Sequence, residues 1–490
     1  MRHGYDAAAV RAAEEPLLAS LPEGTLMQRA AFALARRCAA LLGGVYGARV
    51  VVLAGSGGNG GDALYAGAHL ASRGARVDAL LLTDSVLAPA LAALRHGGGR
   101  IATAGADSDA ALLDSADLVI DGMVGIGATG ALRPPMARLA RLLSTAAATV
   151  VAVDVPSGVD ASTGAVAGAA VRADVTVTFG ALKTGLVVDP AAEHAGRVEV
   201  VDIGLTLPPA ETTLLDAADV AALMPQPHGE SDKYRRGVLG VVAGSDGYTG
   251  AAQLCVGGAL SVGLGMIRYV GEARPAELVS QRWPEAVVTK IAPGDGQAML
   301  AAGRVQAWVA GPGLGTDDDA GRIIDAVLGT DVPVLIDADG ISWLASHRDA
   351  LKKRSAPTLL TPHAGEFARL MGVDREDVEA RRLDHVRRAA AELGVTVLLK
   401  GSTTLVAEPS GAVRVNSAAT AYLATAGSGD VLSGVGGALL AGGLSAFDAG
   451  SVGAFLHGMA GLLAAGRPPA SVTALDIAES IPDAVRAVCS

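Results

Sequence analysis

Short apolar runs recur along the chain, and this pattern most constrains its fold. In the first half they occupy residues 50–53, 77–82, 118–120, 150–153, 175–179 and 198–201. The runs contain β-branched residues, and alanine-rich stretches of helical composition separate most of them. Continuous apolar strands that alternate with helices are typical of a parallel sheet covered on both faces. We therefore predict an α/β fold, preceded by a helical stretch over residues 10–42 that breaks near Pro22.

A second series of apolar runs begins after the proline-containing loop 224–229. It occupies residues 238–242, 266–270, 286–291, 307–310, 334–336, 358–360, 395–399 and 404–407. The two series show no obvious mutual repeat. We predict two α/β domains, 1–213 and 214–490, each large enough for its own core.

Composition excludes several classes of protein. The chain of 490 residues is 50% hydrophobic and has a formal net charge of −11, which argues against disorder and against a nucleic-acid partner. Its three cysteines are far apart, so we expect neither a zinc site nor a disulfide framework, and we expect a cytoplasmic protein. The apolar stretch 431–466 is rich in glycine and contains Asp448 and His457. It predicts a packed helix pair inside a domain and no membrane partner.

Polar residues follow three strands of the first half. Strand 50–53 runs into the glycine loop 55–61, strand 118–120 ends at Asp121, and strand 150–153 ends at Asp154. The carboxyl ends of parallel strands meet at one edge of a sheet, where ligands bind. The glycine loop alone is also compatible with an ordinary turn in which Asp62 caps the next helix. The three strand ends together predict a binding cleft.

This constellation resembles the NAD(P)H-hydrate epimerase family over most of residues 1–210. The resemblance is carried by residues 58–62, 121–131, 153–160 and 178–183. It implies a Rossmann-like domain with a potassium ion held by Asn59, Asp121 and Ser157. The implied substrate-binding residues are Gly58, Asn59, Gly60, Gly61, Asp62, Gly125, Ile126, Gly127, Ala128, Thr129, Gly130, Ala131 and Asp154. The family has an asparagine where this chain has Gly58, so one expected substrate contact is missing.

Epimerising a hydrated nicotinamide at C6 requires the C–O bond or the ring bond to open and reform with either face exposed. A carboxylate at the sheet edge can shuttle the proton. We expect Asp154 to be this catalytic residue.

The second half carries two anion-binding signals. Strand 395–399 delivers Lys400, one of only six lysines in the chain, beside Ser402, Thr403 and Thr404. Residues 425–430 open a glycine-rich helix whose N-terminus can hold an anion, with Asp430 beside it. Each signal alone also fits a plain turn or a helix cap. Together they suggest phosphoryl transfer with Asp430 as the base.

This half resembles the ribokinase-like superfamily, and within it the ADP/ATP-dependent NAD(P)H-hydrate dehydratases, over nearly all of 230–490. The matching segments are 233–237, 244–252, 283–285, 311–315, 337–340, 360–366 and 427–430. The resemblance implies that Ala251, Gly313, His363 and Asp430 face the hydrate. It implies that Lys400, Gly401, Ser402, Thr403, Thr404 and Gly429 hold the nucleotide. Glu366 falls where relatives place an acid near Mg²⁺, and a helix-capping role remains an alternative for His363.

The implied activity is metabolite repair. Asp430 would deprotonate the ring hydroxyl so that it attacks the terminal phosphoryl group of ADP, and phosphate would then leave, giving NAD(P)H and AMP. The first domain would supply the S epimer from the R epimer. Because no basic patch is evident to read a 2′-phosphate, we expect both NADH and NADPH hydrates as substrates, and we expect a homo-oligomer.

Two alternatives remain open at this point. One is a small-molecule kinase of the hydroxymethylpyrimidine or thiazole type with a fused ligand-binding domain. The other makes the first domain a scaffold or nucleotide sensor without catalysis, and its only support is Gly58.

Overall fold

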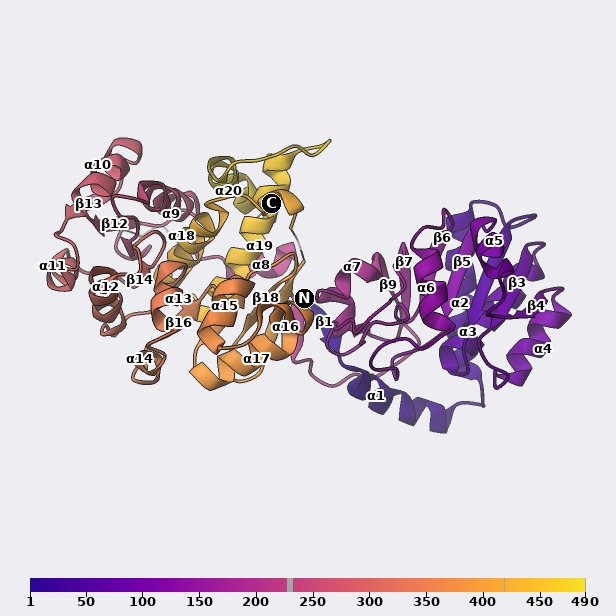
Figure 1. Cartoon of the computed structure of the whole chain (residues 1–490). Helices are drawn as coiled ribbons and strands as arrows, with labels where there is room; N and C mark the ends of the chain where they lie inside the picture. Colours follow the sequence, from indigo (N-terminus) through magenta and orange to yellow (C-terminus); the bar gives the residue numbers. More distant parts are fainter. Residues whose placement is uncertain (227–231, 418, 490) are drawn as a thin grey trace. The chain divides into compact units, whose positions relative to one another are not determined.

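The computed structural model describes residues 1–226, 232–417 and 419–489, so residues 227–229 of the predicted loop 224–229 lie outside the described chain. The chain forms two compact units (Figure 1). One unit is His3–Glu211, and the other is Thr212–Ser490 together with Met1–Arg2.

The unit His3–Glu211 is built on a parallel sheet with the strand order β4-β3-β2-β5-β6-β7-β9. Its strands are β2 (Arg49–Ala54), β3 (Arg76–Leu81), β4 (Arg100–Thr103), β5 (Leu118–Gly122), β6 (Thr149–Val153), β7 (Val175–Phe179) and β9 (Arg197–Val201). The order runs outward from β2 in one direction and from β5 in the other. This switch point between β2 and β5 is where open α/β sheets bind ligands.

Helices cover both faces of this sheet. The helices of this unit are α1 (Ala7–Ser20), α2 (Thr25–Leu42), α3 (Gly58–Ala71), α4 (Ala88–His96), α5 (Ser108–Asp114), α6 (Met136–Leu143) and α7 (Ala192–Ala195), with the short helix η1 (Thr184–Val187). Alternate residues of β2 enter two different cores. Val50 and Val52 pack in one core, and Val51 and Leu53 pack in the other. A strand buried on both faces explains why the sequence shows a continuous apolar run here.

The C-terminal unit contains the strand order β13-β12-β11-β14-β15-β16-β17-β18-β19-β10. The strands are β10 (Thr212–Leu214), β11 (Val238–Val242), β12 (Met266–Gly271), β13 (Val287–Lys290), β14 (Ala307–Ala310), β15 (Val334–Ile336), β16 (Thr358–Leu360), β17 (Thr396–Leu399), β18 (Thr404–Ala407) and β19 (Val413–Asn416). The pairing is parallel from β13 to β17 and antiparallel in β17-β18-β19. The switch point of this sheet lies between β11 and β14.

The C-terminal unit also carries most of the helices in the described part of the chain. They are α8 (Ala217–Leu223), α9 (Thr249–Ser261), α10 (Ala273–Arg282), α11 (Gly296–Ala301), α12 (Asp318–Leu328), α13 (Asp339–Leu344), α14 (Asp349–Lys352), α15 (Ala364–Met371), α16 (Arg375–Ala380), α17 (Arg382–Leu393), α18 (Ser428–Ala441), α19 (Ala446–Ala465) and α20 (Ala474–Cys489), with the short helix η2 (Ala421–Leu423).

The apolar stretch 431–466 forms the buried helices α18 and α19, as predicted. Most residues of both helices are buried, and both helices contribute to the core of the C-terminal unit. Within the part of the chain that the structure describes, no helix combines the length and apolarity needed to cross a membrane.

Glycine allows α9 and α18 to pack with their backbones almost in contact. A Cβ atom added at Gly258 of α9 would lie 2.3 Å from the carbonyl oxygen of Val431, and one added at Gly434 of α18 would lie 2.0 Å from that of Cys255. Real Cβ atoms do not approach that closely. The abundance of glycine in this region is therefore a packing requirement, and the packing holds the N-terminus of α18 in place.

The strands that the sequence pattern missed are short or exposed. Strand β4 is mostly exposed, β8 (Leu182–Lys183) has two residues, and β1 (Arg2–Tyr5) pairs with β8 from the start of the chain. Strands that are this short or this exposed leave no periodic apolar signal in the sequence.

We predict that Gly434→Ala destabilises the C-terminal unit. The added methyl group meets a backbone carbonyl on α9, and overpacking of this kind costs about 1–3 kcal/mol. Differential scanning calorimetry of the full chain should show a lower unfolding temperature. Gly250→Ala is the matched control, because a Cβ atom there meets nothing within 4 Å. Equal unfolding temperatures for the two variants would contradict the packing argument.

Candidate functional sites

The strand ends of the N-terminal unit bring Asn59, Asp121 and Ser157 together. The Asp121 carboxylate accepts hydrogen bonds from the backbone N–H of Ser157 at 2.8 Å and from its hydroxyl at 2.7 Å. The Asn59 amide donates to the carbonyl oxygens of Val124 at 3.1 Å and Val153 at 2.5 Å. The backbone N–H of Val124 donates to the Ser157 hydroxyl, which closes the group.

Asp121 is fully buried at the end of β5 and lacks a basic partner in the described chain. Burial raises its pKa to about 6, against the opposing effect of the hydrogen bonds from Ser157 and Met123. A buried carboxylate surrounded by neutral oxygen-bearing groups is a suitable environment for a cation. The described residues contain no cluster of three or more His, Cys, Asp and Glu side chains arranged to hold a metal.

Asp154 follows β6 and is buried beside Lys183. Its Oδ1 atom accepts from the Lys183 ammonium at 2.5 Å, from the Thr178 hydroxyl at 3.0 Å and from the backbone N–H of Phe179 at 3.1 Å. The ammonium also donates to the carbonyl oxygen of Phe179 at 2.6 Å. Asp154 has a φ of 65°, a conformation that costs free energy for a residue other than glycine and that often occurs at functional sites.

The glycine loop opens α3 as predicted, and Gly58 begins that helix. A Cβ atom at Gly58 would meet nothing within 4 Å, so the space for the family's asparagine side chain is open. Gly60 packs against the carbonyl oxygen of Gly55, where a Cβ atom would lie at 2.1 Å. Asp62, in the first turns of α3, is buried.

The predicted loop from Gly125 to Ala131 runs along the same edge. Gly125 lies against the side-chain oxygen of Asn59, and Gly127 lies against the Arg11 guanidinium. Ala128 and Gly130 help to line a small cavity of about 60 Å³ that also contacts Asp160. The remaining predicted residues Ile126, Thr129 and Ala131 are partly or fully exposed.

A cavity of about 790 Å³ marks the second site, in the C-terminal unit. Seven predicted residues line it: Lys400, Gly401, Ser402, Thr404, Gly429, Asp430 and His363. Thr403 is buried behind this turn and is not part of the lining. Glu366 contributes to the wall.

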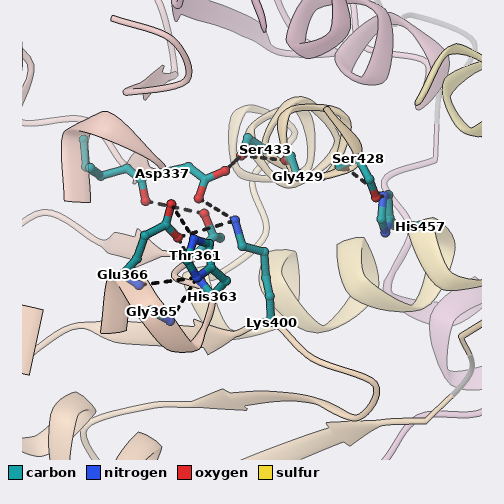
Figure 2. Close-up of polar contacts among 11 residues, drawn as sticks. Asp337, Thr361, His363, Gly365, Glu366, Lys400, Ser428, Gly429, Ser433 and His457 are labelled. Atoms are coloured by element: carbon teal, nitrogen blue, oxygen red, sulfur yellow. Dashed lines mark hydrogen bonds and ion pairs between the residues drawn. The ribbon is translucent and has the colours of Figure 1, made fainter. Parts of the chain in front are cut away.

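An ion pair between Lys400 and Asp337 organises this cavity (Figure 2). The Lys400 ammonium lies 2.8 Å from Asp337 Oδ1, and Ser433 of α18 donates to Asp337 Oδ2 at 2.6 Å. The ends of β15 and β17 are thereby joined to the first turns of α18. Burial alone would lower the pKa of Lys400, but Asp337 and Glu366 together raise it. Lys400 therefore carries its charge throughout the neutral range.

Asp430 lies in the first turn of α18 beside this pair. Burial, followed by the negative charge of Asp337, raises the pKa of Asp430 to about 7, against the opposing effect of Lys400. A carboxyl group with a pKa near 7 can act as a proton acceptor at neutral pH.

His363 caps a helix and also faces the cavity. Its Nδ1 atom accepts from the backbone N–H of Gly365 at 3.0 Å and of Glu366 at 3.4 Å, while Glu366 accepts from the backbone N–H of His363 at 2.8 Å. The capping alternative from the sequence is therefore what the geometry shows. Nδ1 is thus occupied by the helix cap, and Nε2 lies 3.5 Å from Glu366 Oε1.

Ala251 and Gly313 lie together at the switch point between β11 and β14. A Cβ atom at Gly313 would come within 2.8 Å of the Ala251 methyl group, and Gly313 has a φ of 63°. Neither residue lines the 790 Å³ cavity. The predicted hydrate-facing residues are thus divided between the switch point and the cavity.

Sequence reasoning assigned no role to three residues of these sites. Lys183 and Asp337 stood inside recognised motifs, but their partners lie 29 and 63 residues away along the chain. His457, buried in α19, lies 3.0 Å from the carbonyl oxygen and 3.1 Å from the hydroxyl of Ser428, and burial lowers its pKa to about 4. It therefore supports the N-terminus of α18 as a neutral side chain.

Comparisons with known proteins identify the family. Residues 239–483 match the family described as NAD(P)H-hydrate dehydratase, and residues 23–185 match the one described as YjeF-related protein N-terminus. The bifunctional NAD(P)H-hydrate repair enzyme Nnr of Mycobacterium tuberculosis is 50% identical over 444 residues, covering 90% of this chain and 89% of the relative. The enzyme of the same name from Thermofilum pendens is 35% identical and covers 95% and 92%. This chain belongs to the family of bifunctional NAD(P)H-hydrate repair enzymes.

Solved structures agree for the C-terminal unit. An ADP/ATP-dependent NAD(P)H-hydrate dehydratase from Bacillus subtilis, co-crystallised with ATP and Mg²⁺, has a TM-score of 0.51 at 28% identity and covers 56% of this chain and 98% of that chain. A ribokinase-like superfamily protein from Enterococcus faecalis has a TM-score of 0.50 at 22% identity, covers 58% and 98%, and supports the fold alone. The predicted repair-enzyme family and ribokinase-like fold are confirmed, and the kinase alternative is not supported.

We predict that Asp430→Asn stabilises the C-terminal unit, and more strongly at high pH. The folded chain holds the Asp430 pKa above its unfolded value, so ionisation of this carboxyl group destabilises the fold. The stability that the protonated carboxyl provides is lost as pH rises through about 7. Thermal unfolding of wild type and variant should give a difference that grows between pH 4 and about pH 7. If the difference in unfolding temperature between wild type and variant stays constant over this range, ionisation of Asp430 does not destabilise the fold.

Proposed function

We propose that residues 214–490 dehydrate the S hydrate of NADH or NADPH with ADP as co-substrate, and that residues 1–213 convert the R hydrate into the S hydrate. The observation that carries the dehydratase assignment is Asp430 with its raised pKa, at an anion-binding helix N-terminus in a cavity that also contains Lys400. The description of the matching family supports the dehydratase activity, and the relatives are named as bifunctional NAD(P)H-hydrate repair enzymes.

Dehydration faces the problem that hydroxide is a poor leaving group. Asp430 would take the proton of the ring hydroxyl, whose oxygen then attacks the terminal phosphoryl group of ADP. The N–H groups at the start of α18 would stabilise the developing negative charge. The lone pair of the ring nitrogen then expels phosphate, and loss of a proton from the neighbouring carbon gives NAD(P)H, with AMP and phosphate released.

The chain's own residues would hold the nucleotide through charge and hydroxyl groups. We assign this role to the turn from Lys400 to Thr404 and to Gly429, which lies against the Lys400 ammonium. Mg²⁺ commonly binds through one or two carboxylates together with substrate phosphates. Glu366 fits that pattern as a buried carboxylate in the cavity wall, with Lys400 at 3.9 Å.

The epimerase step needs a group that moves a proton at the ring carbon C6. Asp154 is our candidate, because Lys183, Thr178 and Phe179 all contact Oδ1. Within the described chain no donor contacts Oδ2, which leaves this oxygen for the substrate. The space at Gly58 would be filled by solvent or substrate where relatives carry an asparagine side chain.

We further propose that Asn59, Asp121 and Ser157 hold a potassium ion. The buried Asp121 carboxylate without a cationic partner in the described chain fits a monovalent cation, as do the surrounding amide and hydroxyl oxygens. Such an ion would fix the loops after β5 and β6. We also propose a cytoplasmic homo-oligomer that accepts both NADH and NADPH hydrates.

The assay for the proposed function is recovery of absorbance at 340 nm from a mixture of both NADPH-hydrate epimers with the purified chain, ADP, Mg²⁺ and K⁺. We expect a fast phase from the S epimer and a slow phase that ends in full recovery. Asp430→Asn should remove both phases, since general-base removal commonly costs 10²–10⁴-fold in rate. A phosphorylated product without NADPH would contradict the proposal. Recovery that stops at the share of one epimer would contradict the epimerase assignment.

We predict that K⁺ stabilises the N-terminal unit through Asp121. An ion that binds only the folded state adds about 2.7 kcal/mol at a concentration one hundred times its Kd. Calorimetry in K⁺ and in tetramethylammonium at equal ionic strength should show a higher unfolding temperature in K⁺. Asp121→Asn should abolish the difference, whereas Asp78→Asn, on β3 and paired with Arg100, should preserve it. An equal response of wild type and Asp121→Asn would rule out the assigned site.

A further inference from the structure

Among the described residues, Asp62 is a buried carboxyl group without a hydrogen-bond or ion-pair partner. It is 8% exposed, and in the described chain its Oδ1 atom is sealed from solvent and accepts no hydrogen bond. Asp62 is the only carboxylate among the described residues with such an atom. Leaving a charged oxygen buried without a donor costs several kcal/mol, so the group is held in its neutral, protonated form. Its surroundings act in the same direction, because burial and the charges of Asp154 and Glu14 raise the pKa of Asp62 well above its ordinary value.

The helix α3 places Asp62 on the side of the helix that faces the Asp154 strand end. Asn59, one turn earlier on α3, donates to the carbonyl oxygen of Val153, the residue that precedes Asp154. Residues three apart lie on one face of a helix, so Asp62 faces the same strand end. Helix α1 contributes Glu14, which is half-buried. Burial raises the pKa of Glu14, and the charges of Lys183 and Asp154 act on it in opposite directions.

Asp62 and Asp154 therefore differ in their hydrogen-bond and ion-pair partners. Lys183 is the buried cation of this site, and its ammonium is bonded to Asp154 at 2.5 Å. No hydrogen bond or ion pair neutralises Asp62 in the described part of the chain. Asp154 thus has a cationic partner, whereas the buried Oδ1 of Asp62 has no hydrogen-bond donor among the described residues, which favours the protonated form of Asp62. Pairs of acidic groups whose environments separate them in this way serve as acid and base in enzymes.

We propose that Asp62 is the proton donor of the epimerase reaction, with Asp154 as its proton acceptor. The inference rests on the proposed epimerase function and extends it by a second catalytic group. Asp154 takes the proton from the hydroxyl group on C6 while C6=O forms and the C6–N1 bond breaks, and Asp62 gives its proton to N1. Rotation about the open chain exposes the other face of the aldehyde. Reclosure returns one proton to Asp62 and one to the new hydroxyl group, so the enzyme is unchanged.

The test compares Asp62→Asn with Asp154→Asn in the full chain, using the two-phase assay at 340 nm. The fast phase reports the dehydratase and confirms that each variant is folded and loaded with ADP. We expect Asp62→Asn to lower kcat of the slow epimerase phase by at least about 100-fold, with KM for the R hydrate changed by less than about threefold. Its unfolding temperature should not fall, because a neutral amide replaces a buried carboxyl group. Asp78→Asn is the matched control and should leave both phases unchanged.

Each outcome decides between the two claims. If Asp62→Asn raises KM for the R hydrate and keeps kcat, Asp62 binds substrate and the proton-donor role is overturned. In that case an Asp154→Asn variant without epimerase activity would still support the proposed epimerase function. An active Asp154→Asn with a dead Asp62→Asn overturns the assignment of Asp154 and the acid–base pair together. A wild-type chain without a slow phase overturns both. If Asp62→Asn also lost the fast phase, the variant Asp62→Glu would be measured, because it keeps a carboxyl group at this position. An Asp62→Glu variant that epimerises the hydrate supports the proposal. An Asp62→Glu variant with an active dehydratase and an inactive epimerase overturns it.

Discussion

Both units depend on one kind of interaction, an ion pair between a lysine and a buried aspartate at the carboxyl edge of a parallel sheet. Lys183 pairs with Asp154 in one unit, and Lys400 pairs with Asp337 in the other. Each pair joins segments far apart in the sequence and satisfies charges that would otherwise destabilise the fold by several kcal/mol. In a chain with only six lysines, two are used in this way. Each unit also contains a second aspartate whose negative charge the lysine does not neutralise. These residues are Asp62 and Asp430, and burial raises the pKa of both.

Sheet topology explains why these acids gather where they do. The strand order reverses between β2 and β5 in one unit and between β11 and β14 in the other. The glycine loop and Asp121 follow the first pair of strands, and Ala251 and Gly313 lie at the second. The 790 Å³ cavity instead lies beyond β15, β16 and β17. The dehydratase unit thus offers two neighbouring regions, which suits a reaction between a hydrated dinucleotide and a second nucleotide.

The sequence predicted the strand alternation, because buried parallel strands are continuous apolar runs. It also placed the candidate ligand groups after the ends of these strands, which is where the structure has them. It could not show the role of Asp337, since an ion pair over 63 residues depends on strand order, which no local pattern encodes. His457 was noted only as an interruption of an apolar stretch, and its partner Ser428 lies on a different helix. The strands β1 and β8 were missed because they are too short to show a periodic apolar pattern. Gly58 was recognised as a departure from the family, but only the structure shows that the backbone there would accept a side chain.

The position of α18 and α19 in the chain has a consequence for biosynthesis. These helices are apolar on all sides and fill the core against strands that are made much earlier, such as β11 and β14. While a ribosome translates residues 238–427, the growing sheet lacks the part of its cover that α18 and α19 provide. The N-terminal unit has its own cores and can fold during this interval. The C-terminal half must wait until its last helices emerge, and during that time its exposed apolar strands are open to aggregation and to capture by chaperones.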